Sequence, residues 1–174
     1  MVGEQLKKRG FIDIDGLDPA SGMRHQALKK KVYKTYYLEF MDGHRIDDIE
    51  SDAYDCAVAA GCFNLGLLPC AALLEMARVV KPGGLVCFAI FDYNLTAVPE
   101  YNNRLGPLMS WMEKEGVWEL LDTKQRTDSD ITGTMETVYR YTIRASEVDT
   151  SSAPARFPIN GAGSNIYNLN GICH

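Results

Sequence analysis

The chain of 174 residues lacks the features that mark membrane, secreted and metal-binding proteins. No apolar run is long enough to cross a bilayer, and the first residues lack the apolar core of a signal peptide. Its five cysteines form no Cys-x-x-Cys pair and stand mostly in apolar segments, which favours small core residues in a reducing compartment over a disulfide framework. The three histidines are not clustered, so we expect no metal site. These absences predict a cytoplasmic protein.

Excess positive charge is also absent. The formal net charge is −5, and cationic runs such as Lys29–Lys31 are short, so we expect no nucleic-acid partner. A hydrophobic content of 46% and a charged content of 24% are ordinary for a globular domain. Because Ser, Pro, Gly and Asn dominate near the end, we expect one domain over residues 1–148 and a disordered tail over residues 149–174.

The most informative segment runs from Tyr54 to Ile90. It predicts a strand, a loop, an amphipathic helix, a Pro-Gly-Gly turn at residues 82–84 and a second strand, which is the repeating unit of a parallel α/β sheet. Both strands are almost continuously apolar, so we expect each to be covered on both faces. The helical stripe is formed by Leu73, Met76, Ala77 and Val80, while Glu75 and Arg78 point away from it.

The flanking segments extend this α/β pattern. We expect a first helix that ends at Gly10, a strand over residues 11–18, a helix over residues 19–30 and a strand over residues 32–40. After the central unit, we expect a helix over residues 99–116. Period-two alternation over residues 117–123 and 135–144 predicts an antiparallel hairpin at the sheet edge.

A strand that starts with Tyr54-Asp55, a helix with Glu75 and Arg78-Val79-Val80, and a Lys81-Pro82-Gly83-Gly84 turn together resemble the second half of the class I S-adenosylmethionine-dependent methyltransferases. A narrower likeness is to the methyltransferase-like proteins linked to the Williams–Beuren chromosomal region. It is supported by residues 3–11 and 116–119. The resemblance covers about residues 2 to 144 and implies a Rossmann-like three-layer sandwich with a mostly parallel sheet and a C-terminal antiparallel hairpin.

One element of the resembled fold has no counterpart in the chain: the first strand and its Gly-rich loop. The resemblance places that strand in the middle of the sheet, between residues 11–18 and 54–63. We expect a truncated product in which these two strands pair directly, with a strand donated by another chain as the alternative. The string at residues 161–163 has the Gly-x-Gly pattern but lacks the strand–turn–helix context of a nucleotide site.

Asp18 is the foremost candidate for a binding residue. It follows an apolar strand and precedes a helix, where its carboxylate can accept hydrogen bonds from two vicinal ribose hydroxyls. By resemblance it corresponds to the acidic residue that holds the ribose of S-adenosylmethionine. The competing interpretation is that Asp18 only caps the following helix.

Other cofactor contacts are expected near strand ends. Ser21 and Met23 can line the ribose and adenine side, and Asp42 can accept the adenine amino group. Packing and solvated charge explain Met23 and Asp42 equally well. Ala60 and Gly61 are small enough to let the cofactor approach the backbone. Phe63 can form a wall of the substrate pocket, and no catalytic residue is identified.

The resemblance implies transfer of a methyl group from S-adenosylmethionine to an unidentified small-molecule or protein acceptor. The missing loop favours an alternative, a catalytically inactive interaction module or fragment whose exposed strand edges bind a protein partner. A nicotinamide-dependent oxidoreductase is a poorer third hypothesis, because the chain has neither a Gly-rich loop nor a Tyr-x-x-x-Lys pair.

Overall fold

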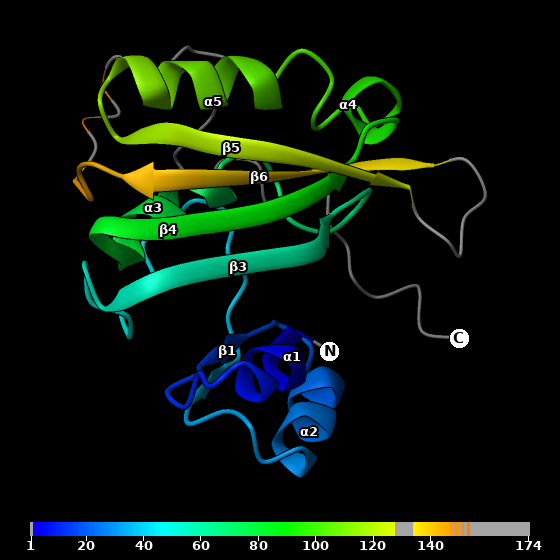
Figure 1. The fold of residues 1–174 in the computed structure, drawn as a ribbon, viewed down its shortest axis with the longest axis vertical. Helices are drawn as coiled ribbons and strands as arrows, with labels where there is room; N and C mark the ends of the chain where they lie inside the picture. Colours follow the sequence, from blue (N-terminus) through cyan, green and yellow to red (C-terminus); the bar gives the residue numbers. More distant parts are fainter. Residues whose placement is uncertain (1, 128–133, 148, 150, 152, 154–174) are drawn as a thin grey trace. The chain divides into compact units, whose positions relative to one another are not determined.

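A computed structural model describes residues 2–127, 134–147, 149, 151 and 153 (Figure 1). These residues form two compact units, divided between Phe40 and Met41. Within the described ranges, no helix combines the length and apolar character needed to span a bilayer. The expected tail over residues 149–174 falls mostly outside the described residues.

The first unit contains two helices and two short parallel strands. They are α1 (Val2–Lys8), β1 (Gly16–Leu17), α2 (Ser21–Lys29) and β2 (Tyr36–Tyr37). Gly10 follows α1 with a φ of 95°, so the predicted left-handed end of the first helix is confirmed. Gly16 pairs with Tyr36, and a Cβ at Gly16 would lie 2.5 Å from the Tyr36 ring, so only glycine fits there.

Both strands of the first unit are shorter than predicted. The sequence predicted strands over residues 11–18 and 32–40, but the paired residues number two in each strand. Ile14 is the only large apolar side chain of this unit that is buried among the described residues, whereas Ile12 is 82% exposed. A strand persists only where a neighbour satisfies its backbone groups and covers its side chains, and β1 has β2 as its single neighbour.

The second unit is built on a four-stranded sheet of order β3-β4-β6-β5 (Figure 1). Its strands are β3 (Tyr54–Phe63), β4 (Val80–Phe91), β5 (Trp118–Thr127) and β6 (Met135–Ile143). β3 and β4 are parallel, and β6 pairs antiparallel with both β4 and β5. The predicted parallel unit and C-terminal hairpin are therefore confirmed.

The central parallel pair differs from the prediction in two details. The pairing jumps from Tyr54–Val80 to Cys56–Leu85, so the predicted turn at residues 81–84 is an insertion inside β4. Gly83 has a φ of 83° there. The expectation that both strands are covered on both faces is wrong for β3. This strand lies at the sheet edge, and Val58 is 40% exposed.

Helix α3 (Ala72–Val79) carries the predicted apolar stripe but also buries a charge. Leu73, Met76 and Ala77 are buried, as the sequence predicts. Glu75, which was expected to point away from that stripe, is 3% exposed because its carboxylate has partners from the preceding loop and from Arg78.

The predicted helix over residues 99–116 is shorter, α5 (Leu105–Lys114), and a separate short helix, α4 (Asn94–Ala97), precedes it. Pro99 lies between them and not in the first turn of a helix. The predicted stripe of α5 is nevertheless correct, since Leu105, Leu108, Met109 and Met112 are all buried. In Figure 1, α5 runs alongside β5, and the Trp118 indole donates to the Met109 carbonyl at 3.2 Å.

The direct pairing expected between residues 11–18 and 54–63 stays a prediction, because these segments belong to different units. Among the described residues, β1 pairs with β2 in one sheet, and β3 is an edge strand of the other.

Candidate functional site

Asp18 lies directly after β1, at the carboxyl end of the two-stranded sheet. Its amide donates to the Tyr37 carbonyl at 3.1 Å, and its Oδ1 accepts from the Ala20 amide at 2.8 Å. Ribose binding and capping of the following helix are thus both compatible with the geometry of Asp18, because capping uses only Oδ1. Within the described part of the chain, Oδ2 accepts no hydrogen bond. Burial and the nearby Asp18 charge raise the pKa of Tyr36.

Ser21 and Met23 lie in the first turn of α2, five residues or fewer from Asp18. Both are exposed, and Met23 is 45% exposed. The residue that precedes the helix is Ala20, whose side chain offers no cap. Packing inside the first unit therefore does not explain Met23, and its predicted contact with a ligand stays a prediction.

Asp42 belongs to the second unit and has a local partner. Its Oδ1 accepts from the His44 amide at 3.1 Å and contacts His44 Nδ1. This carboxylate is thus engaged by its own loop. Its expected contact with an adenine amino group stays a prediction.

Ala60 and Gly61 lie in the last part of β3 and are exposed. Gly61 has a φ of 72°, and a Cβ there would meet nothing within 4 Å. The glycine is therefore required by backbone conformation and not by crowding from the described residues. The pairing of β3 with β4 is irregular between Ala59 and Phe63 and resumes where Phe63 pairs with Ile90.

Phe63 is 1% exposed and lies inside the second unit. Its ring centroid is 5.1 Å from that of Phe88 and 6.1 Å from that of Tyr101. The predicted role as a pocket wall is untested. In this structure the ring is a core side chain with almost no surface for a substrate.

Sequence reasoning missed Asn94, which joins the carboxyl ends of β3 and β4. Asn94 is fully buried, and its Nδ2 donates to the Phe63 carbonyl at 3.0 Å. Although residues 94–96 have the pattern of a glycosylation sequon, burial leaves the amide inaccessible to a glycan. The signal that could have identified its role is a polar residue three positions after the end of an apolar strand.

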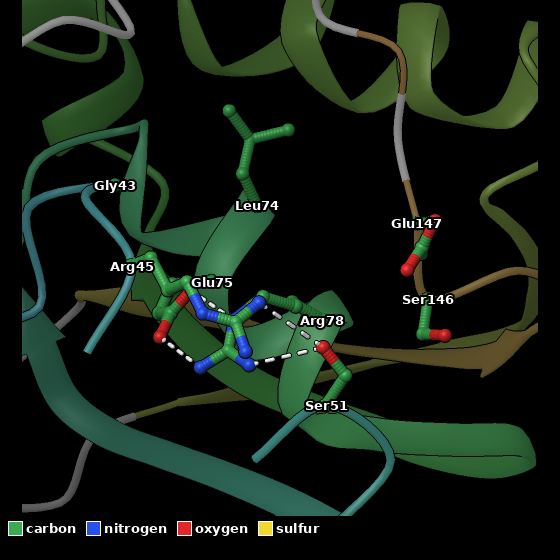
Figure 2. A pocket seen from close by; sticks show the side chains of 8 residues that line it. All are labelled: Gly43, Arg45, Ser51, Leu74, Glu75, Arg78, Ser146 and Glu147. Atoms are coloured by element: carbon green, nitrogen blue, oxygen red, sulfur yellow. Dashed lines mark hydrogen bonds and ion pairs between the residues drawn. The ribbon is translucent and has the colours of Figure 1, made fainter. Parts of the chain in front are cut away.

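A cavity of about 200 Å³ lies elsewhere in the second unit, between the loop after Gly43 and α3 (Figure 2). On its wall, Arg78 donates to Glu75, to Ser51 and to the Ile49 carbonyl, and Glu75 Oε1 accepts from the Ile46 amide at 2.9 Å. These bonds raise the pKa of Arg78, chiefly through Glu75. The cluster fixes the loop to the helix, and none of the predicted site residues lines the cavity.

The four described cysteines are free thiols. Cys62 Sγ contacts the Ala60 carbonyl at 3.4 Å. Burial raises the pKa of Cys56, Cys70 and Cys87. Among the described residues, no three side chains of His, Cys, Asp or Glu lie together in a way that could hold a metal ion.

Comparison with known proteins identifies a family. The model of a methyltransferase domain family matches residues 2–88, which is half of the chain. Human methyltransferase-like protein 27 is 29% identical over 119 residues, which cover 68% of this chain and 47% of that protein. The chain therefore spans about half the length of this curated relative.

Solved structures show the same fold at low sequence identity. A putative S-adenosylmethionine-dependent methyltransferase from Listeria monocytogenes superposes with a TM-score of 0.59 at 13% identity, covering 80% of this chain and 84% of that one. The N-methyltransferase NodS from Bradyrhizobium japonicum, in complex with S-adenosyl-L-homocysteine, superposes with a TM-score of 0.54 at 12% identity. The match covers 76% of this chain and 67% of that one. The predicted Rossmann-like methyltransferase fold is confirmed.

Proposed function

The chain belongs to the methyltransferase domain family, with the fold of class I S-adenosylmethionine-dependent methyltransferases, and from this we propose that it binds S-adenosylmethionine and transfers its methyl group. The family match over residues 2–88 is the observation that carries the proposal. The NodS structure supports the choice of cofactor, because that relative of the same fold holds S-adenosyl-L-homocysteine.

We assign the ribose of the cofactor to Asp18. Its Oδ2 is available although Oδ1 caps the turn into α2. Ser21 and Met23 are proposed to contact the ribose and adenine side, and their exposure supports this. Ala60 and Gly61 are proposed to contact the cofactor through the backbone, with Asp42 at the adenine amino group.

Methyl transfer requires little acid–base chemistry from the protein. The sulfonium of S-adenosylmethionine is already an activated electrophile, so alignment with the acceptor can supply most of the rate enhancement. The site residues proposed above hold the cofactor and orient its methyl group. The acceptor is a small molecule or a protein, and the four free thiols support a reducing, cytoplasmic location.

A titration of the full chain with S-adenosyl-L-homocysteine, followed by calorimetry, tests this proposal. We expect a saturable heat with one site per chain, because the product of the reaction shares the adenosine and amino-acid groups of the cofactor. Adenine alone serves as the control and should bind more weakly. If no heat develops at any soluble concentration of S-adenosyl-L-homocysteine, the proposal is wrong.

A second candidate function is an inactive interaction module. The open edge of β3 favours it, since residues 56–63 carry no charge, whereas the opposite edge strand β5 carries Glu119, Asp122, Lys124 and Arg126. Charged edges resist pairing with other chains and uncharged ones invite it. Failure of the titration together with self-association in solution would favour this candidate.

A further inference from the structure

Three segments of the second unit meet where β3 and β4 end. The Asn94 amide donates to the Phe63 carbonyl at 3.0 Å, which joins the loop after β3 to the turn after β4. The Asp92 amide donates to the Met135 carbonyl at 2.9 Å, which joins the same turn to the start of β6. We call the surface formed by residues 63–68, 91–95 and 135–137 the strand-end rim.

Buried polar side chains hold the strand-end rim in place. The Tyr101 hydroxyl, on a side chain with 1% exposure, lies 2.9 Å from the Asn64 carbonyl and 2.7 Å from the Leu68 carbonyl. Asn94, which is fully buried, fixes the neighbouring carbonyl of Phe63. A surface fixed in this way needs little reorganisation to bind a ligand.

The rim exposes large apolar side chains in spite of its rigid support. Leu65 is 73% exposed, Leu67 and Tyr93 are each 47% exposed, and Met135 is 38% exposed. The Tyr93 ring stacks on Phe91 at a centroid distance of 5.8 Å, which fixes its orientation. Such a concentration of exposed apolar side chains on a fixed surface is typical of a binding site.

The spare polar atoms of the rim are hydrogen-bond acceptors. Asp92 Oδ1 accepts from Thr137 at 2.6 Å, but Oδ2 has only a long contact of 3.4 Å with Gln125. Asn94 Oδ1 has no hydrogen-bond partner in the described residues either, but it is buried and does not reach the surface of the rim. The Thr137 hydroxyl already donates its proton to Asp92. A ligand that matches Asp92 Oδ2 therefore brings a hydrogen-bond donor and positive charge.

From these observations we propose that the strand-end rim binds the methyl acceptor and that this acceptor is an apolar amine. The ammonium group pairs with Asp92, and the apolar part lies against Tyr93 and the exposed leucines. This inference rests on the proposed methyl transfer. A carboxylate or phosphate ligand would instead be repelled by the negative charge of Asp92 and would find no hydrogen-bond donor there.

The reaction balances for such an acceptor. The bound ammonium loses one proton to water, and the free electron pair on nitrogen forms a bond to the methyl carbon. The carbon–sulfur bond breaks with its electrons on sulfur, which leaves S-adenosyl-L-homocysteine and a methylated ammonium. Asp92 then stabilises positive charge on nitrogen before and after transfer.

Three probes of equal size test the proposal on the full chain: phenethylamine, phenethyl alcohol and phenylacetate. We expect phenethylamine to bind at least about tenfold more tightly than phenylacetate, since hydrogen bonds to charged groups have this magnitude. Asp92→Asn should remove the preference for the amine, while binding of phenethyl alcohol stays unchanged. Tyr93→Ala should weaken the binding of all three probes. Leu121 is an exposed side chain of β5, and Leu121→Ala should weaken the binding of none.

Each probe is titrated with and without S-adenosyl-L-homocysteine, which separates this inference from the function on which it rests. Equal binding of amine and alcohol, or an unchanged preference in Asp92→Asn, overturns the amine assignment even where S-adenosyl-L-homocysteine binds. Binding of the amine without any binding of S-adenosyl-L-homocysteine would retain the rim as an amine site and reject methyl transfer. A Tyr93→Ala variant that binds phenethylamine normally overturns the rim as its location.

Discussion

Replacing Arg78 by methionine should lower the free energy of unfolding by about 3–5 kcal/mol, the usual effect of removing one partner from a buried ion pair. The side chains of Glu75 and Arg78 are 2% and 12% exposed, and their closest approach is 2.6 Å. Methionine keeps most of the aliphatic volume but leaves the Glu75 carboxylate buried without a countercharge. The Ile49 carbonyl also loses its donor. Urea unfolding followed by circular dichroism measures the change.

Two further variants make the Arg78 result specific. Glu75→Gln in the Arg78→Met background should restore part of the lost stability, because the uncompensated charge is then gone. Lys81→Met removes an exposed pair with Asp55, whose side chain is 91% exposed, and should change stability little. An equal loss in Arg78→Met and Lys81→Met would show that the buried cluster has no special role.

Asp18→Asn should weaken binding of S-adenosyl-L-homocysteine at least about tenfold, since a hydrogen bond to a charged group contributes about 1.5–3 kcal/mol. A carboxylate accepts from both vicinal ribose hydroxyls, whereas an amide offers a single acceptor atom. Asparagine can still accept from the Ala20 amide, so the turn into α2 should persist. Calorimetry measures the affinity, and the thermal unfolding midpoint monitors the fold.

Asp13→Asn is the matched control for Asp18. Asp13 belongs to the same unit, and its side chain is 74% exposed and pairs with Lys34 at 3.3 Å. Asp13→Asn also removes one negative charge, but it should leave the affinity for S-adenosyl-L-homocysteine unchanged. If both variants bind equally well, Asp18 is a helix cap only, which is the competing interpretation of its position.

Periodicity predicted the elements whose packing is local in sequence. The β3–α3–β4 unit follows from two apolar strands around a helical stripe, and the β5–β6 hairpin follows from period-two alternation. Both could be predicted because each pattern is contained in a short stretch of chain. The lengths of β1 and β2 could not be predicted in this way. Apolar residues such as Ile12 and Leu38 extend a strand only where a neighbouring strand pairs with them, and the local sequence does not specify that neighbour.

The missed site residues depend on contacts distant in sequence. Glu75 has the appearance of a solvated helix residue, and only the Ile46 amide, 29 positions earlier, makes its burial possible. Asn94 has the appearance of a sequon, and its bond to the Phe63 carbonyl spans 31 positions. Of the predicted site residues, Asp18 lies at a strand end as expected, while Phe63 is in the core. No pattern of nearby residues distinguishes these two outcomes.

Amide signals of the labelled full chain test the proposed cofactor site most directly. On addition of S-adenosyl-L-homocysteine, we expect signals from residues 16–23, around Asp18, to shift and to saturate with a single dissociation constant. Signals from residues 16–23 that stay unchanged in an excess of the ligand would contradict the assignment of the ribose to Asp18.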